Sequence, residues 1–317
     1  MSERRAAVAA PVGERRGARR RALSWRRRRQ LAGLLCVLPA LACTTVFFFV
    51  PLGLDFWMSL NQWPLLGDHQ FIGLQNYAEA VHDSGFLDSV GVTVLYTVII
   101  TPALLVLAFV LALLTQGTDR ASRFFRTLYF LPVPVGLASA SYLFVWLVQP
   151  NVGPIGRLLQ VTGAVHQPPV WLAATVPALL VVVGMVVWKV TGLQMILLMA
   201  GMQSIPDAMH EAATVDGAGW WRRFLFITLP LLRPTLALVL VFSVAGSLLA
   251  FDQFYIITAG GPSNSTLTVV YQIYRTSFVS FHLGYGAALS ILTMLVLAAV
   301  SAIQLLLIRQ SDRKSVV

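Results

Sequence analysis

The sequence predicts an all-α integral membrane protein with about six transmembrane helices. Its 317 residues are 57% hydrophobic and only 11% charged, whereas soluble domains carry about a quarter charged residues. Mean hydropathy is +0.75, and the apolar residues gather in six separate runs. The few charged residues could not cover a core of this size in water. Lipid is therefore the expected solvent.

Each of the six runs is long enough to cross about 30 Å of hydrocarbon as a helix. The first is longer than the roughly 7–15 residues of a signal-peptide core, and the second contains no charged residue. Lys189 interrupts the fourth, and Asp252 lies near the end of the fifth. The runs cover residues 31–54, 89–114, 128–148, 173–202, 235–258 and 284–308.

The positive charges are distributed very unevenly. The net charge of +10 would by itself favour a nucleic-acid partner, but 11 of the 23 Lys and Arg residues lie within residues 1–29. With the N-terminus inside, 20 fall on the inner side and only Arg157 and Arg275 on the outer side. This asymmetry predicts cytoplasmic termini and a membrane protein without a nucleic-acid partner.

Three regions follow from this pattern. Residues 1–29 are expected to form a basic, disordered cytoplasmic arm, residues 30–310 a transmembrane domain, and residues 311–317 a cytoplasmic tail. Within the transmembrane domain, residues 203–234 form a polar segment between the fourth and fifth spans on the cytoplasmic side.

That segment predicts a short helix, a turn and a second helix. Ser204 is expected to cap the first helix, with Pro206 in its first turn. Gly217 suits the left-handed position where that helix stops. A second helix from about residue 218 would place Trp220, Phe224 and Ile227 on one face, and Pro230 with Pro234 would end it. Such a pair could link two spans, lie in the lipid interface or dock on a soluble partner, and composition alone favours the linker.

The residues of this segment resemble the "EAA" loop of permease subunits of binding-protein-dependent ABC importers. The matching residues are Glu211-Ala212-Ala213, Asp216-Gly217, Ile227-Thr228-Leu229-Pro230 and Pro234. Residues 188–192 and 198–206 resemble the span-four pattern of the carbohydrate-type branch, and residues 71–77 and 258–262 resemble its outer loops. The resemblance covers most of residues 31–308 and implies the type I permease fold.

The resemblance also implies a division of labour. A second permease subunit, two copies of an ATPase subunit and an extracellular binding protein would complete the importer, which would sit in the bacterial inner membrane. ATP and Mg would be bound by the ATPase, so this chain would need no cofactor. The coupling residues that the resemblance implies are Glu211, Ala212, Ala213, Asp216, Gly217 and Pro230.

The sequence itself offers no catalytic or metal constellation. Of its two lysines, neither Lys189 nor Lys314 lies in a P-loop. His210-Glu211 lacks the second His that a metal-binding helix would carry four residues after the first. We therefore expect a transport component rather than an enzyme.

The solute path is expected among polar and aromatic residues of the spans. Intramembrane ionisable groups usually face protein or water, although Lys189 would equally serve as a structural partner or extend toward the inner surface. Sugar sites combine aromatic faces with hydroxyl and amide groups. The candidates are Lys189, Gln194, Ser243, Ser247, Asp252, Gln253, Tyr142 and Trp146.

The expected function is thus one permease subunit of an ATP-driven importer for a sugar or related polar solute. The alternative is a stand-alone secondary transporter or channel, a class that commonly shows inverted repeats or several intramembrane charges, neither of which the sequence shows clearly. The identity of the solute stays open at this stage.

Overall fold

The computed structural model describes residue 33 and residues 35–314 of the chain, and it describes the side chains as far as residue 307. The described residues divide into two units at the Trp57–Met58 bond. The predicted basic arm, residues 1–29, and the end of the predicted tail, residues 315–317, lie outside the described residues.

The first unit holds most of one apolar helix. It runs from Leu35 to Ser59, with a π-helical turn, η1 (Thr45–Phe49), before α2 (Val50–Ser59). Its most apolar 18-residue stretch has a mean hydropathy of 2.2 and is 0% buried. Such a surface requires lipid or another protein to cover it.

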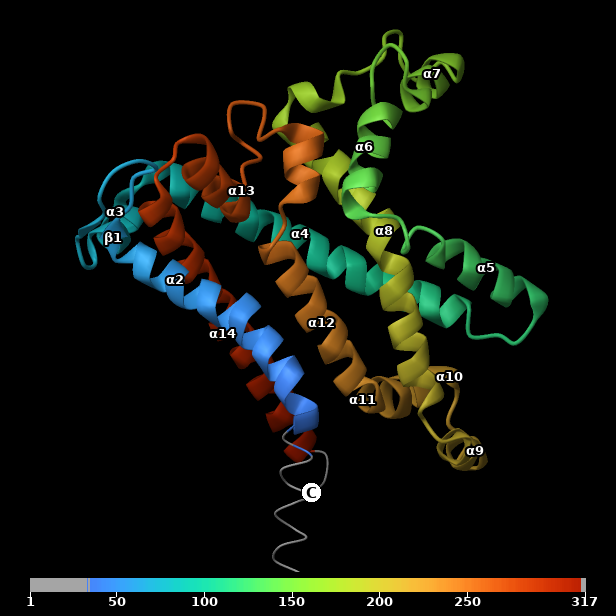
Figure 1. Cartoon of the computed structure of the whole chain (residues 1–317). Helices are drawn as coiled ribbons and strands as arrows, with labels where there is room; N and C mark the ends of the chain where they lie inside the picture. Colours follow the sequence, from blue (N-terminus) through green and yellow to red (C-terminus); the bar gives the residue numbers. More distant parts are fainter. Residues whose placement is uncertain (1–32, 34, 315–317) are drawn as a thin grey trace, which may run out of the picture. The chain divides into compact units, whose positions relative to one another are not determined.

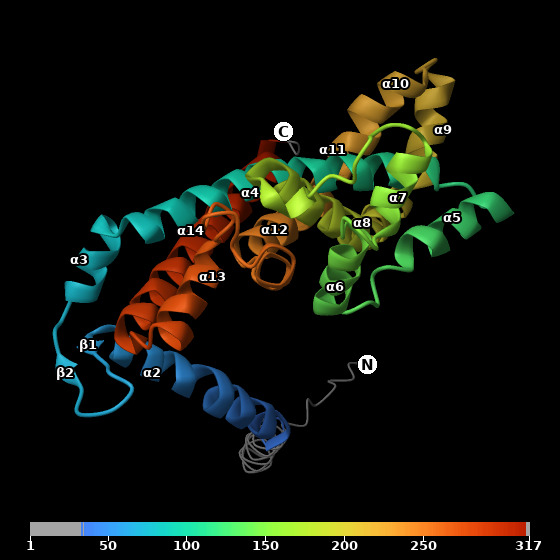
Figure 2. The same cartoon turned by 90° about the horizontal axis from the view of Figure 1, so that it is seen from above.

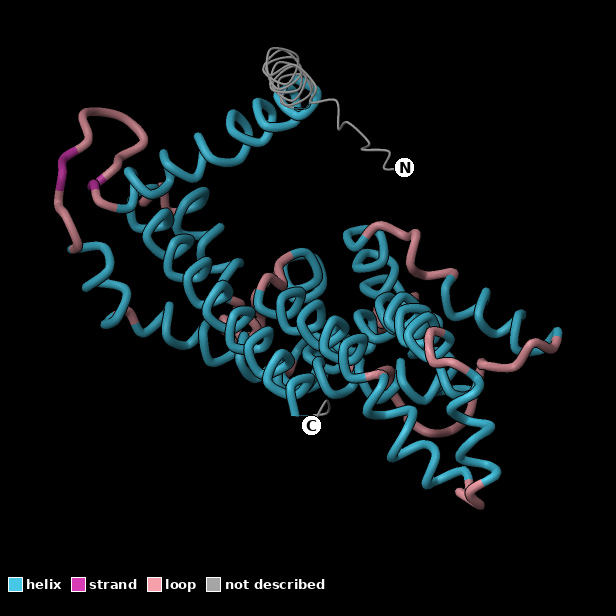
Figure 3. The backbone as a smooth tube through the Cα atoms, turned by 90° about the horizontal axis from the view of Figure 1, so that it is seen from below, coloured by secondary structure: helices cyan, strands magenta, loops and turns pink. Residues whose placement is uncertain are grey.

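The second unit begins with a structured loop. Strands β1 (Asn61–Gln62) and β2 (Gln70–Phe71) form an antiparallel hairpin, which is followed by α3 (Gln75–His82). Figure 3 shows these two strands in magenta. The buried Asn76 side chain donates to the carbonyl oxygens of Ser59, at 2.8 Å, and Asn61, at 3.1 Å. These bonds fix α3 to the end of the preceding helix.

Three helices build the core of the second unit. Helices α4 (Ser84–Leu114), α8 (Thr175–Gln203) and α12 (Arg233–Leu248) contact one another, and α14 (Leu283–Lys314) packs on α12. Figures 1 and 2 show α12 beside both α4 and α14. Because α14 extends to Lys314, the helix continues into the predicted tail.

The predicted third span is not one helix. It is divided into α5 (Arg120–Phe130) and α6 (Leu137–Leu147), and the turn between them contains Pro132 and Pro134. Each proline removes a backbone donor and disfavours helix in the residue before it. The 11 residues of α6 reach only about 16 Å along the helix axis, which is too short to cross the membrane.

The predicted fifth span is shorter than expected as well. Helix α12 ends at Leu248, and a separate π-helical turn, η4 (Phe254–Thr258), carries the rest of the run. By length and composition the described residues contain four helices that could cross a membrane, or five if the bent pair around Leu232 counts as one span. The all-α membrane fold is confirmed, but a count of six continuous helices is not.

Shorter elements connect these helices. The remaining elements are α7 (Pro154–Val161), η2 (Trp171–Ala173), α9 (Asp207–Val215), α10 (Trp220–Arg223), η3 (Phe224–Thr228), α11 (Leu229–Leu231), α13 (Val269–Tyr274) and η5 (Arg275–Val279). Figure 1 shows α9 and α10 at one end of α8, with α7 beyond the other end.

Candidate coupling site and solute cavity

The segment between α8 and α12 folds as the sequence predicts, with a helix, a turn and a second helix. Helix α9 ends in a Schellman arrangement: the Gly217 N–H donates to Thr214 O at 3.1 Å and the Ala218 N–H to Ala213 O at 2.8 Å. Gly217 has a φ of +76°, the left-handed conformation predicted for it. The second helix begins at Trp220.

The predicted start of α9 is wrong in detail. Pro206 is the N-cap residue and lies before the first turn, and no side chain caps the helix. The Ser204 hydroxyl instead donates to the Gly201 carbonyl at 2.7 Å. Ser204 therefore closes the end of α8, because that helix runs to Gln203 and places an acceptor within its reach.

The two helices of this segment are joined through side chains. Arg223 Nη1 donates to Thr214 Oγ1 at 2.9 Å across the turn. Trp220 and Phe224 stack with ring centroids 5.3 Å apart and an interplanar angle of 6°. The Arg223–Thr214 bond joins α9 to the second helix, and the stacked rings confirm that Trp220 and Phe224 share a face of that second helix as predicted.

The helix pair is also fixed to the long helices. The Phe224 ring packs against Phe109 of α4 at 5.8 Å. A Cβ atom at Gly201 of α8 would lie 2.8 Å from both Leu232 Cδ1 and Thr235 Cβ, so the end of α8 and the start of α12 approach closely. A bend of 63° separates the Trp220–Leu231 helix from α12, where Pro230 and Pro234 were expected to turn the chain.

The outward side of the helix pair is open. Glu211, Ala212, Asp216 and Gly217 are exposed, and Ala213 and Pro230 are half-buried. Two large apolar side chains of the same segment also face outward, Val215 at 88% exposure and Trp221 at 68%. Large apolar side chains that are exposed together mark a surface covered by a protein partner or by the membrane.

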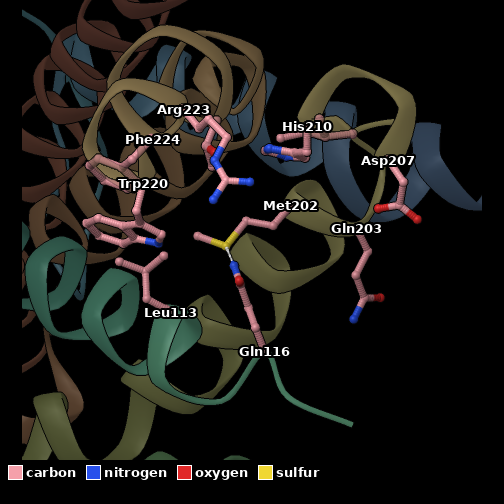
Figure 4. Close-up of a pocket in the computed structure, with 11 residues that line it drawn as sticks. Leu113, Gln116, Met202, Gln203, Asp207, His210, Trp220, Arg223 and Phe224 are labelled. Carbon is pink, nitrogen blue, oxygen red and sulfur yellow. Dashed lines mark hydrogen bonds between the residues drawn. The ribbon is translucent and has the colours of Figure 1, made fainter. Parts of the chain in front are cut away.

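A pocket of about 490 Å³ lies beside the helix pair. Figure 4 shows Trp220 and Leu113 at one side of it and His210 with Asp207 at the other. The Gln116 amide, at the end of α4, contacts the Met202 sulfur between them. The pocket thus lies between the loop after α4 and both helices of the pair.

A second cavity lies among the long helices and has a volume of about 340 Å³. Gln194 of α8 donates to Ser243 Oγ of α12 at 2.8 Å, and Ser247 lines the same cavity one turn further along α12. Gln253 lines it as well, so the structure brings together four of the eight predicted solute-path residues. The polar lining also includes Tyr96, which was missing from the prediction.

The sequence of α4 alone could have predicted that Tyr96 faces protein or water. The most apolar stretch of α4 has a mean hydropathy of 2.8, yet Ser89, Thr93 and Tyr96 recur at intervals of four and three residues, and all three are buried. A polar stripe with this period lies on one face of a helix. In a membrane span such a face turns toward protein or water.

The other four predicted residues lie apart from the lining of this cavity. Lys189 Nζ donates to the Val133 carbonyl oxygen at 3.0 Å, in the proline-containing turn before α6. Asp252 is half-buried, and Tyr142 and Trp146 on α6 are exposed.

Comparison with known proteins shows which family the chain belongs to. The family model described as binding-protein-dependent transport system inner membrane component matches residues 73–313. The chain belongs to this family. It is a membrane permease that works in a binding-protein-dependent transport system, and the prediction of a transport component instead of an enzyme is confirmed. The alternative of a stand-alone secondary transporter or channel is thereby excluded.

Curated relatives extend the match over most of the permease. This chain is 34% identical over 274 residues to the sn-glycerol-3-phosphate transport system permease protein UgpA of Agrobacterium fabrum. The match covers 85% of this chain and 92% of the relative. UgpA of Salmonella typhimurium is 35% identical over 276 residues, covering 85% and 91%. A probable ABC transporter permease protein of Pyrococcus horikoshii is 30% identical over 264 residues, covering 83% and 90%.

A solved structure shares the fold. The permease superimposes on a chain of a bacterial ABC transporter involved in the import of the acidic polysaccharide alginate, with a TM-score of 0.78 and 21% identity. The match covers 91% of this chain and 99% of the other. The predicted type I permease fold of an ABC importer is confirmed.

Proposed function

We propose that the permease is one of two membrane-spanning subunits of an ATP-binding-cassette importer for a sugar or related polar solute. It would lie in the bacterial inner membrane with both termini in the cytoplasm, as the distribution of Lys and Arg favours. Relatives named for sn-glycerol 3-phosphate and a structural neighbour named for alginate support a polar, hydroxylated solute.

The exposed helix pair carries this proposal. Helix α9, with Glu211, Ala212 and Ala213, would enter a groove on a separate ATPase subunit, and Asp216 with Gly217 would form the turn behind it. The exposed Val215 and Trp221 side chains supply apolar area for such a contact. Pro230 would mark the point where the second helix bends into α12.

The contacts described above connect the helix pair to the long helices that line the cavity, so a movement of the pair would be transmitted to them. Phe224 links the helix pair to Phe109 of α4, and the close approach at Gly201 links α8 to α12. The same three helices line the 340 Å³ cavity. A tilt of the helix pair would therefore move the cavity walls together, as expected of packed elements that switch between two arrangements.

The proposed role of this subunit determines which other subunits the importer needs. Two copies of a nucleotide-binding ATPase would bind ATP and Mg, a second permease would face the long helices, and an extracellular binding protein would deliver the solute. The apolar surface of the Leu35–Ser59 helix would face lipid or the second permease.

We place the central part of the solute path at the cavity lined by Gln194, Ser243 and Ser247. Lys189, held on the Val133 carbonyl, would fix the proline turn beside the path. Asp252 would lie on the path beyond the cavity, next to the cavity residue Gln253. Tyr142 and Trp146 would lie on α6, toward the second permease.

Charge reversal at the helix pair tests the proposal. Glu211→Lys should lower ATP-driven uptake by the reconstituted importer at least tenfold, because the carboxylate would meet the ATPase. The amount of permease in the membrane should not change, since Glu211 is exposed. Glu79→Lys, the same change at an exposed position on α3, is the matched control and should keep uptake within twofold. Normal uptake by Glu211→Lys would contradict the proposal.

A further inference from the structure

A groove between α4, α5 and α8 is lined mainly by apolar side chains. Its volume is about 470 Å³, and its walls include Leu111 of α4, Leu128 and Tyr129 of α5, and Trp188 of α8. Helix α5 turns back from the loop after α4 (Figure 1) and contacts α8. No charged side chain is among the described residues that line the groove.

The groove is open to its surroundings. Leu128 is 47% exposed, and Leu131, which lines the groove from the proline turn, is 66% exposed. Helices α4 and α8, which form the other walls, are both long and apolar enough to cross a membrane. Exposed leucines around a groove on such helices are covered by hydrocarbon or by protein. The chemistry at the end of the groove distinguishes these two kinds of occupant.

Arg126 closes the groove at the loop between α4 and α5. Its Nε donates to the Thr115 carbonyl at 2.7 Å and its Nη2 to the Gly117 carbonyl at 2.5 Å. The groove residue Leu111 lies one turn before Thr115, and the groove residue Tyr129 lies one turn after Arg126. These bonds use two of the five N–H groups of the guanidinium, so the others can donate to a ligand at this end of the groove.

Arg126 is the last of three arginines in a row. Arg120, Arg123 and Arg126 follow one another at intervals of three residues on α5, a spacing that makes side chains neighbours on a helix surface. Arg120 and Arg123 are exposed. Asp119 precedes the row, but its carboxylate caps α5 by accepting from the Ser122 N–H at 3.2 Å and the Ser122 hydroxyl at 2.5 Å. The end of the groove therefore carries a net positive charge.

We propose that this groove binds an anionic phospholipid, with an acyl chain along its leucines and the phosphate at Arg123 and the free N–H groups of Arg126. Arginine binds phosphate oxygens through several N–H groups at once, and basic pockets between membrane helices on the cytoplasmic side bind acidic lipid head groups. The site uses the orientation proposed above, in which the start of α5 lies at the cytoplasmic surface. A second permease would need no cation at the end of the groove, whereas a lipid presents hydrocarbon and an anion in one molecule.

Photolabelling tests the proposal. The importer, purified in detergent with the subunits with which it assembles, is exposed to phosphatidylglycerol or phosphatidylcholine that carries the same photoreactive acyl chain. Phosphatidylglycerol should label peptides that contain residues 128–132 and 187–192 at least fivefold more than phosphatidylcholine does, because only its head group is a net anion. Inorganic phosphate at the same concentration should not lower this labelling, since it cannot occupy the apolar groove.

Two variants test the two halves of the site. Arg123→Gln should lower labelling by phosphatidylglycerol about fivefold, because one arginine near the head group is lost. Leu128→Trp should lower it at least as much by filling the groove. Both positions are exposed, so the importer should still assemble, which gel filtration checks.

The matched controls make the same changes elsewhere. Arg157→Gln changes an exposed arginine on α7, and Leu295→Trp changes a leucine on α14 that is 55% exposed. Neither position lines the groove. Both controls should keep labelling within twofold of the unchanged chain.

Several results would overturn the lipid site. These are equal labelling by the two lipids, labelling that maps away from the groove, labelling that free phosphate removes, and labelling that is unchanged in both Arg123→Gln and Leu128→Trp. Absence of labelling by either lipid would also overturn it, as expected where the second permease fills the groove. None of these measurements involves uptake, so any of these results would leave the proposed function standing.

Discussion

At the turn between α9 and α10, the backbone of one residue sets the direction of the second helix. Gly217 adopts a φ of +76°, whereas the nearby Gly219 has a φ of −65°. Neither position has an atom within 4 Å of where a Cβ would lie. The two glycines therefore differ in conformation and not in available space, which makes them a matched pair.

Gly217→Ala should destabilise the helix pair by about 1 kcal/mol, because an L-residue in the left-handed region costs roughly that amount. Gly219→Ala should cost less, about 0.5 kcal/mol, since alanine readily adopts its backbone conformation and only the N-cap preference for glycine over alanine is lost. Hydrogen exchange at the Ala218 amide, which bonds to Ala213 O, measures the difference. Equal protection in both variants would show that the left-handed turn is not what holds the pair.

Sequence reasoning succeeded at residues whose role is local. Gly217 and the stacked Trp220 and Phe224 were predictable because turn chemistry and helical spacing determine them. The Ser204 prediction failed because its hydroxyl could either accept from an N–H at the start of α9 or donate to a carbonyl at the end of α8, and only the position where α8 ends decides between them. Lys189 could not be paired with Val133 from sequence, since the two residues are 56 positions apart and only tertiary packing brings them together.

Helix α8 shows how one element fits its neighbours. Gly192 lies where α8 crosses the end of α5, and a Cβ there would fall 2.8 Å from the Tyr129 carbonyl carbon and 3.2 Å from Phe130 Cα. This close approach gives the glycine of the 188–192 pattern a structural reason. Gly184, two turns earlier on the same helix, has open space around it.

Gly192→Ala should therefore lower stability by about 1–3 kcal/mol, because backbone must move to admit the methyl group. Gly184→Ala should be neutral or stabilise by up to about 1 kcal/mol, since alanine is the better helix former. Thermal unfolding of the purified complex in detergent compares the two. A Gly192→Ala variant as stable as Gly184→Ala would contradict the packing of α5 on α8.

The interrupted third and fifth spans show where an apolar run wrongly predicts one continuous helix. Hydropathy alone predicted one helix over residues 128–148, although Pro132 and Pro134 stand inside that run. The two prolines indicated in the sequence that this helix would be interrupted. Asp252 was a weaker indication of the interruption after Leu248. The cavity residues Gln194 and Ser243 were predicted by residue type, but their meeting depends on packing between α8 and α12.

The molecule as a whole exposes far more apolar surface than a protein in water does. The most apolar stretch of α8 is 44% buried within the chain, whereas that of the Leu35–Ser59 helix is 0% buried. Lipid and protein partners must therefore supply much of the burial that stabilises the fold. This explains why composition predicted the membrane environment reliably, although the partners themselves are outside the sequence.

The proposed function requires the α9–α10 pair to face the cytosol and engage an ATPase. A cysteine crosslinking experiment tests both requirements: Cys36 and Cys43 are replaced with serine and Ala212→Cys is introduced in the assembled importer. We expect a crosslink from position 212 to the ATPase that changes with ATP, and no labelling by a membrane-impermeant maleimide added outside intact cells. Labelling from outside, or an active importer without any ATPase crosslink at this position, would contradict it.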